Sequence, residues 1–171
     1  MKRACLLTGE PGCGKTTIIK EVLAQSNESA GGFYTEEIRS KEVRQGFKIT
    51  TLDGKSAILA HIDVRSPCRV SKYGVDVESM DKLAVPTIKE ATETKDIVII
   101  DEVGKMELFS GSFKEAVIEA LQSGKKVLGT IMLASHPWAD KIKERPEVKI
   151  IRVTKANRSE VIAKVLDWLA T

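Results

Sequence analysis

Long apolar runs and cysteines are both scarce in this sequence of 171 residues. No stretch approaches the roughly 18 consecutive apolar residues that a membrane-spanning helix needs. The three cysteines, Cys5, Cys13 and Cys68, are odd in number and far apart, so they predict no disulfide framework. The apolar run from Ala4 to Leu7 is too short for the core of a secretory signal. These absences favour a reducing, cytoplasmic setting.

The sequence also lacks a strong excess of either charge. It has 27 Lys and Arg residues and 24 Asp and Glu residues, which give a net charge of +3. The basic residues are scattered among acids, so the sequence does not predict a nucleic-acid-binding surface. The composition, 42% hydrophobic and 30% charged, is that of an ordinary globular chain, and no repeat or Pro/Gly/Ser-rich linker divides it. We therefore expect one domain over residues 1–171, with a sizeable core, that acts as a monomer.

The clearest motif is Gly9-Glu-Pro-Gly-Cys-Gly-Lys-Thr16, which matches G-x-x-x-x-G-K-[ST]. It follows a strand expected at residues 3–8 and opens a helix expected at residues 14–25. The glycines let backbone N–H groups turn inward around a polyphosphate, and the helix adds the positive end of its dipole. Lys15 would then reach the β- and γ-phosphates, and the Thr16 hydroxyl would bind Mg²⁺. The motif predicts a nucleoside triphosphate site.

The remaining patterns indicate how the chain is organised. Three β-rich segments, at residues 31–39, 46–52 and 56–62, predict a small antiparallel patch on the main sheet. A helical region spans residues 77–92, with a bend at Pro86. Ser112 and Glu115 fit a capping box for a helix that Gly124 closes. From residue 96 onward the order is strand, helix, strand, helix, strand, helix, which predicts an α/β fold with a mainly parallel sheet flanked by helices.

Two acids follow the apolar strand expected at residues 97–100. Asp101 has the pattern of a Walker B aspartate, which holds Mg²⁺ directly or through water. Glu102 is placed to take a proton from an attacking water molecule. A surface acid at a strand end is the alternative interpretation of Glu102. Paired with the phosphate loop, the two acids predict hydrolysis of a triphosphate.

Further segments occur in a specific order: GGFYTEEIR from Gly31, GFKI from Gly46, KYGVDV from Lys72, DEVGKMELFS from Asp101, GTI from Gly129 and VTKANR from Val153. With GEPGCGKTT they make the chain resemble the THEP1-type nucleoside-triphosphatases over nearly its whole length. The resemblance implies a RecA-like P-loop fold. It also implies Mg²⁺-dependent hydrolysis of ATP, GTP, CTP and UTP to the diphosphate and phosphate. The chain departs from the family pattern at Ser71, where a glycine is usual, and at residues 132–136, where a proline is frequent.

The phosphate loop and the Walker B pattern predict that Lys15, Asp101 and Glu102 are catalytic and that Thr16 and Asp101 bind Mg²⁺. The resemblance implies that residues 10–17 and 99–105 bind the nucleotide, and the loop motif adds Gly9. The residues that would bind the nucleotide lie in the loop and around the two acids: Gly9, Glu10, Pro11, Gly12, Cys13, Gly14, Lys15, Thr16, Thr17, Ile99, Ile100, Asp101, Glu102, Val103, Gly104 and Lys105.

Arg158 is a further candidate for nucleotide binding. It follows the last expected strand, at the edge of the sheet where nucleotide-binding folds often contact the base. A guanidinium stacks on any purine or pyrimidine, which would explain tolerance for several bases. The alternative is that this segment is a helix start, with Asn157 and Glu160 as the capping pair.

Five further residues each have a structural interpretation beside a functional one. Cys13 is read as a small side chain that fits the loop, with a redox role as the alternative. Lys105 either reaches the γ-phosphate or forms a surface ion pair. Tyr73 packs under a loop or stacks on a base. Arg39 is a surface charge or a site residue, and Arg145 is a solvated helix-end charge or a lid arginine.

Two rival functions remain open at this point. P-loop kinases share these motifs, so the first alternative is a kinase that phosphorylates a nucleoside or nucleotide. A nucleotide-dependent binding module is the second rival, and a clustered basic face would be its mark.

Overall fold

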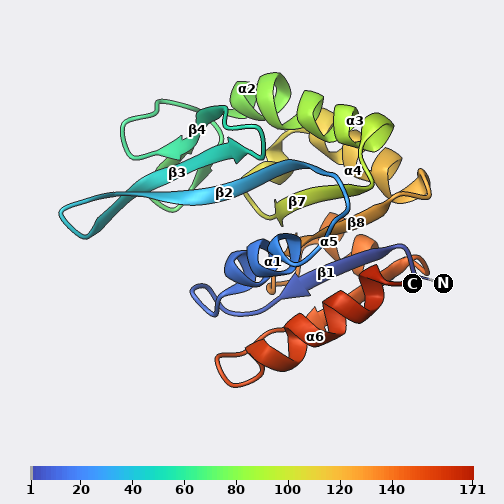
Figure 1. Ribbon diagram of the computed structural model, residues 1–171. Coiled ribbons are helices and arrows are strands. Elements are labelled where there is room, and N and C mark those ends of the chain that lie inside the picture. The colour runs from blue at the N-terminus through green and yellow to red at the C-terminus, as the bar shows by residue number, and fades with distance from the viewer. Residues whose placement is uncertain (1) are drawn as a thin grey trace.

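Five runs of apolar and β-branched residues form the parallel centre of a nine-stranded sheet (Figure 1). The computed structural model describes residues 2–171. The central strands stand in the order β2-β7-β8-β1-β9, and each is parallel to its neighbour. Their bounds are β1 (Ala4–Thr8), β2 (Ala30–Ser40), β7 (Ile97–Val103), β8 (Lys126–Ile131) and β9 (Val148–Arg152). Strands β1, β7 and β8 are almost wholly buried, as strands covered on both faces must be.

An antiparallel extension continues the sheet beyond β2. The first residues of β2 pair with β7, and its remainder pairs with β3. The turn between β2 and β3 places Lys41 and Glu42 in the left-handed region, as a tight hairpin requires. The expected antiparallel patch is thereby confirmed. Its strands are β3 (Val43–Thr51), β4 (Ser56–His61), β5 (Arg69–Val70) and β6 (Tyr73–Val75).

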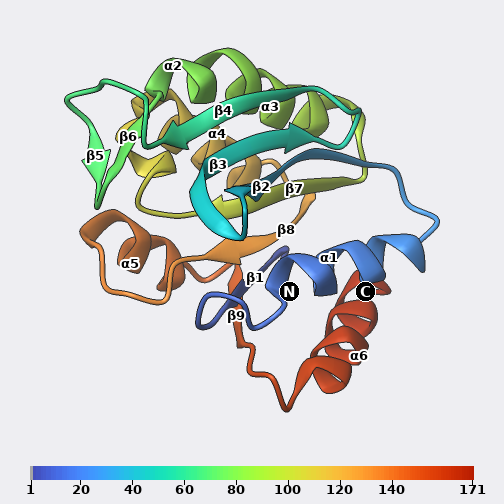
Figure 2. The ribbon, with the colours of Figure 1, turned by 90° about the vertical axis from the view of Figure 1, so that its left-hand side faces the viewer.

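Helices cover the two faces of the parallel sheet separately, so the molecule has three layers (Figures 1 and 2). On one face, α1 (Lys15–Ala24) and α6 (Arg158–Leu169) pack through Ile18, Val22, Val161 and Val165. On the other face, a larger apolar cluster joins the sheet to α3 (Val85–Thr94), α4 (Gly111–Gln122) and α5 (Pro137–Lys143). None of the helices within residues 2–171 is both long and apolar enough to cross a bilayer.

The helical region before β7 differs from the expected helix with a bend at Pro86. It begins as α2 (Val77–Ser79), passes through a π-helical segment, η1 (Met80–Ala84), and continues as α3 to Thr94. Pro86 lies in the first turn of α3. A proline lacks the N–H for the regular ladder and its ring crowds the preceding turn. The irregularity therefore falls one turn before the proline, as a wider π turn.

The cap of α4 is not the predicted capping box. Ser110 is the N-cap, and its hydroxyl accepts a hydrogen bond from the Phe113 N–H at 3.0 Å. Ser112 lies inside the first turn and is exposed. The prediction placed the helix start two residues too late because either serine satisfies the local pattern. The predicted end is confirmed, since Gly124 follows the helix with φ +81.

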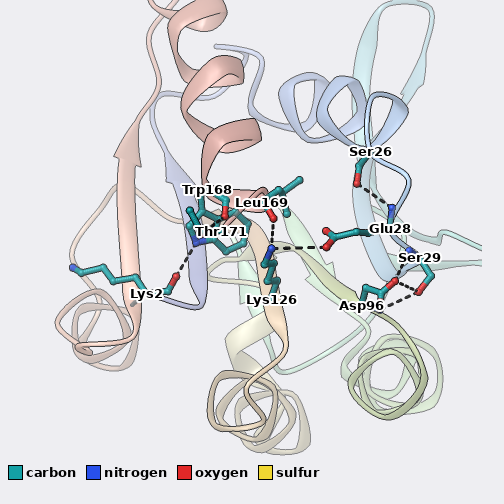
Figure 3. A network of polar contacts seen from close by, with 9 residues as sticks. All are labelled: Lys2, Ser26, Glu28, Ser29, Asp96, Lys126, Trp168, Leu169 and Thr171. Atoms are coloured by element: carbon teal, nitrogen blue, oxygen red, sulfur yellow. Dashed lines mark hydrogen bonds and ion pairs between the residues drawn. The ribbon is translucent and has the colours of Figure 1, made fainter.

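Polar contacts fasten the edge of the sheet at which the parallel strands begin (Figure 3). The Trp168 indole N–H of α6 donates to the Lys2 carbonyl at 2.8 Å, and the Lys126 ammonium donates to the Leu169 carbonyl. Asp96 accepts two hydrogen bonds from Ser29, from its N–H and its hydroxyl, each at 2.9 Å. These contacts leave the opposite edge, where the strands end, free for the functional site.

Candidate active site

The loop between β1 and α1 has the backbone that a phosphate loop needs. Gly12 and Gly14 adopt φ +77 and +97, which side chains other than glycine rarely tolerate. The Lys15 ammonium donates to the carbonyl oxygens of Gly9 at 2.7 Å and Glu10 at 3.1 Å. A positive charge is therefore held at the mouth of the loop, beside the start of α1.

Asp101 joins the loop to the centre of the sheet. It lies inside β7, which runs on to Val103 rather than ending at residue 100 as expected. Its Oδ2 accepts from the Thr16 hydroxyl at 2.6 Å, and its Oδ1 accepts from the Thr130 hydroxyl, also at 2.6 Å. The carboxylate is only 4% exposed. Burial raises its pKa, while the two hydroxyls and the Lys15 charge act in the opposite direction.

Thr130 is a site residue that the sequence did not reveal by itself. It is fully buried at the end of β8, the strand between β7 and β1. A polar residue in the otherwise apolar run of β8 was the available signal. Parallel strands end at the same edge of a sheet, so the Thr130 hydroxyl on β8 lies close to Asp101 on the neighbouring strand β7.

Glu102 lies beside Asp101 and borders the same cleft. Burial raises its pKa, the Asp101 charge raises it further, and the Lys15 charge lowers it. Gly104 leaves space for this carboxyl group, because a Cβ at that position would lie 2.6 Å from the Glu102 Oε1. The carboxyl is thus held in a drier environment than a surface acid, as suits a group that accepts a proton.

Glu107 and Thr35 are two further polar residues of the site that sequence analysis did not assign to it. The Thr35 hydroxyl hydrogen-bonds to the Asp101 carbonyl at 2.9 Å and to the Glu107 Oε2 at 3.3 Å. Glu107 is 3% exposed, and burial followed by the Glu102 charge raises its pKa well above the usual range. The only signal in the sequence was that Glu107 is an acid within the segment KMEL. Its spacing from Glu102 does not predict that the two side chains lie close together.

One cleft contains both ends of this constellation. Its volume is about 820 Å³, and the phosphate loop, Asp101 and Glu102 all line it. Thr16 and Asp101 offer a hydroxyl and a carboxylate, the hard oxygen donors that Mg²⁺ takes together with phosphates and water. Across residues 2–171 no group of three His, Cys, Asp or Glu side chains could hold a metal alone. The donor set fits a Mg²⁺ that arrives with a triphosphate.

Comparison with known proteins gives the same assignment. The model of the NTPase family matches residues 4–166. The chain belongs to the NTPase family. Membership makes it an enzyme of the nucleoside-triphosphatase class and confirms the resemblance seen in the sequence.

Relatives of this NTPase match it from end to end. The nucleoside-triphosphatase THEP1 of Thermotoga maritima is 46% identical over 164 residues, which cover 96% of this chain and 94% of the relative. The human cancer-related nucleoside-triphosphatase is 40% identical over 182 residues, with 97% and 96% covered. The crystal structure of THEP1 from Aquifex aeolicus superimposes with a TM-score of 0.88 at 35% identity, covering 98% of this chain and 99% of that one. The expected α/β P-loop fold is confirmed.

Several predicted nucleotide-binding residues of this NTPase do not present side chains to the cleft. Ile99, Ile100 and Val103 are buried in β7, and Cys13 is buried beneath the loop, 3.8 Å from the Lys15 ammonium. Their side chains support the site from within the core. The loop residues Gly9, Glu10, Pro11, Gly12, Gly14, Thr16 and Thr17 line the cleft, as does Lys105, which is exposed.

Arg158 lies against the phosphate loop. A Cβ on Gly14 would be 2.8 Å from the Arg158 Nε, so the guanidinium covers the start of α1. The predicted helix start is confirmed, with Asn157 at the N-cap position of α6. Its side chain does not cap the helix, because it accepts from the Thr154 N–H and donates to the Arg152 carbonyl. Arg158 follows β9 and Asp101 lies on β7, on opposite sides of β1. Arg158 is not among the residues that line the cleft, so its contact with a nucleotide stays a prediction.

The other candidates of this NTPase are structural. Tyr73 is 7% exposed and packs edge-on against Phe47, which confirms packing. Arg39 forms an ion pair with Glu37 at 2.7 Å and does not line the cleft. Arg145 pairs with its neighbour Glu147, so the lid interpretation is not supported.

Proposed function

We propose that this chain hydrolyses nucleoside 5′-triphosphates to the diphosphate and phosphate, with Mg²⁺, and that it accepts ATP, GTP, CTP and UTP. The observation that carries the proposal is the 2.6 Å hydrogen bond between Thr16 and Asp101, residues 85 positions apart. It brings the phosphate loop and the acid of β7 to one point in one cleft. The names of the relatives, nucleoside-triphosphatases in bacteria and human, support the reaction class.

Each residue has a distinct part in the proposed reaction. Lys15 would exchange the carbonyl oxygens of Gly9 and Glu10 for phosphate oxygens, since charged acceptors form the stronger hydrogen bonds. Thr16 and Asp101 would hold the Mg²⁺, which supplies charge neutralisation of the phosphates. Thr130 fixes the rotamer of Asp101. Glu102 would orient the attacking water and take its proton.

The broad base tolerance follows from what lies at the far end of the site. The exposed Arg158 guanidinium beside Gly14 offers a planar surface on which any base can stack. Stacking reads the face of a base and not its edge, so it discriminates weakly. We also propose that the enzyme works as a cytoplasmic monomer.

Phosphate release from each of the four triphosphates, with Mg²⁺ or with EDTA, tests the proposal. We expect release with all four, no release with EDTA, and a loss of about 100-fold or more in Glu102→Gln with nucleotide binding retained. Full activity of Glu102→Gln would show that another residue accepts the proton of the attacking water. Activity in EDTA would remove Mg²⁺ from the mechanism.

A further inference from the structure

The lining of the cleft includes apolar side chains in addition to the phosphate loop and the acids, and these side chains make up an apolar part of it. This part, the acceptor compartment, is formed by Phe47, Leu59, Val70, Met132 and Leu133. Phe47, Leu59 and Val70 come from β3, β4 and β5 of the antiparallel extension, and Met132 and Leu133 follow β8. Hydrolysis of a triphosphate needs none of these residues.

The acceptor compartment lies beyond the γ-phosphate rather than around the base. A P-loop directs its lysine and hydroxyl to the β/γ end of the phosphates, so that end of the nucleotide points toward Asp101 and Glu102 on β7. Arg158, which is proposed above to stack on the base, lies on the other side, beyond β1. In the sheet, β2 and β3 stand on the far side of β7 from β1. The extension therefore faces the position from which the γ-phosphorus is attacked.

The chemistry of the compartment favours a ligand with a planar ring. Its walls are an aromatic ring, aliphatic side chains and a methionine, which pack on ring faces. The Arg44 guanidinium is held by Glu37 at 2.6 Å and stacks 5.3 Å from the centre of the Phe47 ring. Glu37 also pairs with Arg39 at 2.7 Å, so two guanidinium groups share this carboxylate. The planar Arg44 guanidinium extends the surface on which a ring can stack beside Phe47.

We propose that the acceptor compartment binds a nucleoside or similar heterocyclic alcohol, to which the enzyme transfers the γ-phosphoryl group. The proposal rests on the function proposed above. The acceptor hydroxyl oxygen forms the new bond to the γ-phosphorus, and the bond from phosphorus to the β,γ-bridging oxygen breaks. The nucleoside diphosphate leaves with that electron pair. The hydroxyl proton passes to Glu102, and hydrolysis is the same reaction with water in place of the alcohol.

The direct test supplies ATP labelled in the γ-phosphate, Mg²⁺ and five nucleosides: adenosine, guanosine, cytidine, uridine and thymidine. We expect at least one nucleoside to become labelled and to reduce the phosphate released to water. If none is labelled and none changes phosphate release, the proposal is overturned. Nucleoside monophosphates form a second arm. Labelling of monophosphates without nucleosides would overturn the nucleoside as acceptor and point to Arg44 or Lys105, two cations that line the cleft, as the phosphate-binding residue.

A matched pair of variants localises the acceptor. Val70→Trp narrows the compartment, whereas Ile58→Trp changes an exposed residue that does not line the cleft. We expect Val70→Trp to lower labelling of the nucleoside about tenfold or more while phosphate release to water persists, and Ile58→Trp to behave as the wild type. Equal labelling by the two variants would contradict the location. Titration of adenosine into the complex with ADP and Mg²⁺ gives a second readout by calorimetry, in which Val70→Trp should lose the binding heat.

Lys15→Ala separates this proposal from the hydrolytic one. Phosphate release that depends on Lys15, without transfer to any nucleoside, would leave hydrolysis standing and remove the acceptor site. Phosphate release unaffected by Lys15→Ala would remove both.

Discussion

At the scale of single residues, the site is a cluster of three acids near the Lys15 ammonium group, and two of the acids accept hydrogen bonds from threonine hydroxyls. Asp101 and Glu107 are buried and Glu102 is half-buried, and desolvation raises the pKa of each. Only Asp101 receives two short hydroxyl hydrogen bonds, from Thr16 and Thr130. It is therefore the acid best prepared to stay ionised beside a cation, while burial and the Glu102 charge raise the pKa of Glu107.

The space that Gly104 leaves for Glu102 gives the first prediction. In Gly104→Ala the new Cβ would lie 2.6 Å from the Glu102 Oε1, so the carboxyl group must move. We expect turnover to fall about tenfold or more because the proton acceptor is displaced, with nucleotide affinity nearly unchanged. Steady-state kinetics and a binding titration measure the two effects. Gly111→Ala, where a Cβ meets nothing within 4 Å, is the control. Wild-type turnover in Gly104→Ala would show that Glu102 need not keep this position.

The buried hydroxyl of Thr130 gives the second prediction. Thr130→Val preserves shape but removes a hydrogen bond to the Asp101 carboxylate, and such bonds contribute about 1.5–3 kcal/mol. We expect a lower free energy of unfolding and a higher Mg²⁺ concentration for half-maximal activity. Thr130→Ser, which keeps the hydroxyl, should restore the Mg²⁺ dependence. An unchanged Mg²⁺ dependence in Thr130→Val would mean that Asp101 is oriented by other groups.

At the scale of elements, the positions of strands and helices were predictable because hydrophobic periodicity reports them directly. The run before Asp101 and the alternation in β3 and β4 are two clear cases. Caps and irregular turns were less predictable, since they depend on partners distant in sequence. Ser110 and Ser112 fit the local pattern equally well, and only Ser110 also bonds Asp81 of η1. The π turn at Met80–Ala84 likewise has no periodic signature.

The cap of α4 can be tested by two neighbouring serines. Ser110→Ala removes the hydroxyl that accepts from the Phe113 N–H, so we expect a loss of about 1–2 kcal/mol in the free energy of unfolding. Ser112→Ala changes an exposed hydroxyl within the helix and should alter stability by less than about 0.5 kcal/mol. Urea denaturation of both variants gives the comparison. A larger loss in Ser112→Ala would restore the capping box read from the sequence.

At the scale of the whole molecule, the two ends of the parallel strands differ in role: one is closed by structural contacts and the other carries the candidate site. The edge where strands begin is closed by contacts among α6, β1, β8 and the segment before β2 (Figure 3). The edge where strands end carries the loop, the acids and the cleft. Sequence alone placed Lys15, Thr16, Asp101 and Glu102 at this edge. It did not find Thr35, Thr130 or Glu107, because their roles depend on which strands become neighbours.

Asp96 provides a pH test of the closed edge. Two hydrogen bonds from Ser29 lower the pKa of Asp96, so its contribution to stability is present above its unfolded pKa, near 4, and is lost as pH falls through its folded pKa. We expect the wild type to be more stable than Asp96→Asn at neutral pH and this difference to shrink in acid. Unfolding free energies measured from pH 7 downward give the result, with Glu93→Gln as a control on an exposed acid of α3. A difference independent of pH would contradict the ionic origin of the contact.

The central claim is that Lys15, Thr16 and Asp101 form one site for a Mg²⁺-bound triphosphate. The most direct measurement is calorimetric titration of a non-hydrolysable ATP analogue into wild type and Lys15→Ala, each with Mg²⁺ and with EDTA. The account predicts Mg²⁺-dependent binding to the wild type and an affinity lower by about tenfold or more in Lys15→Ala, because one charge-assisted contact contributes at least about 1.4 kcal/mol. Equal affinity of the two proteins, or binding indifferent to Mg²⁺, would contradict it.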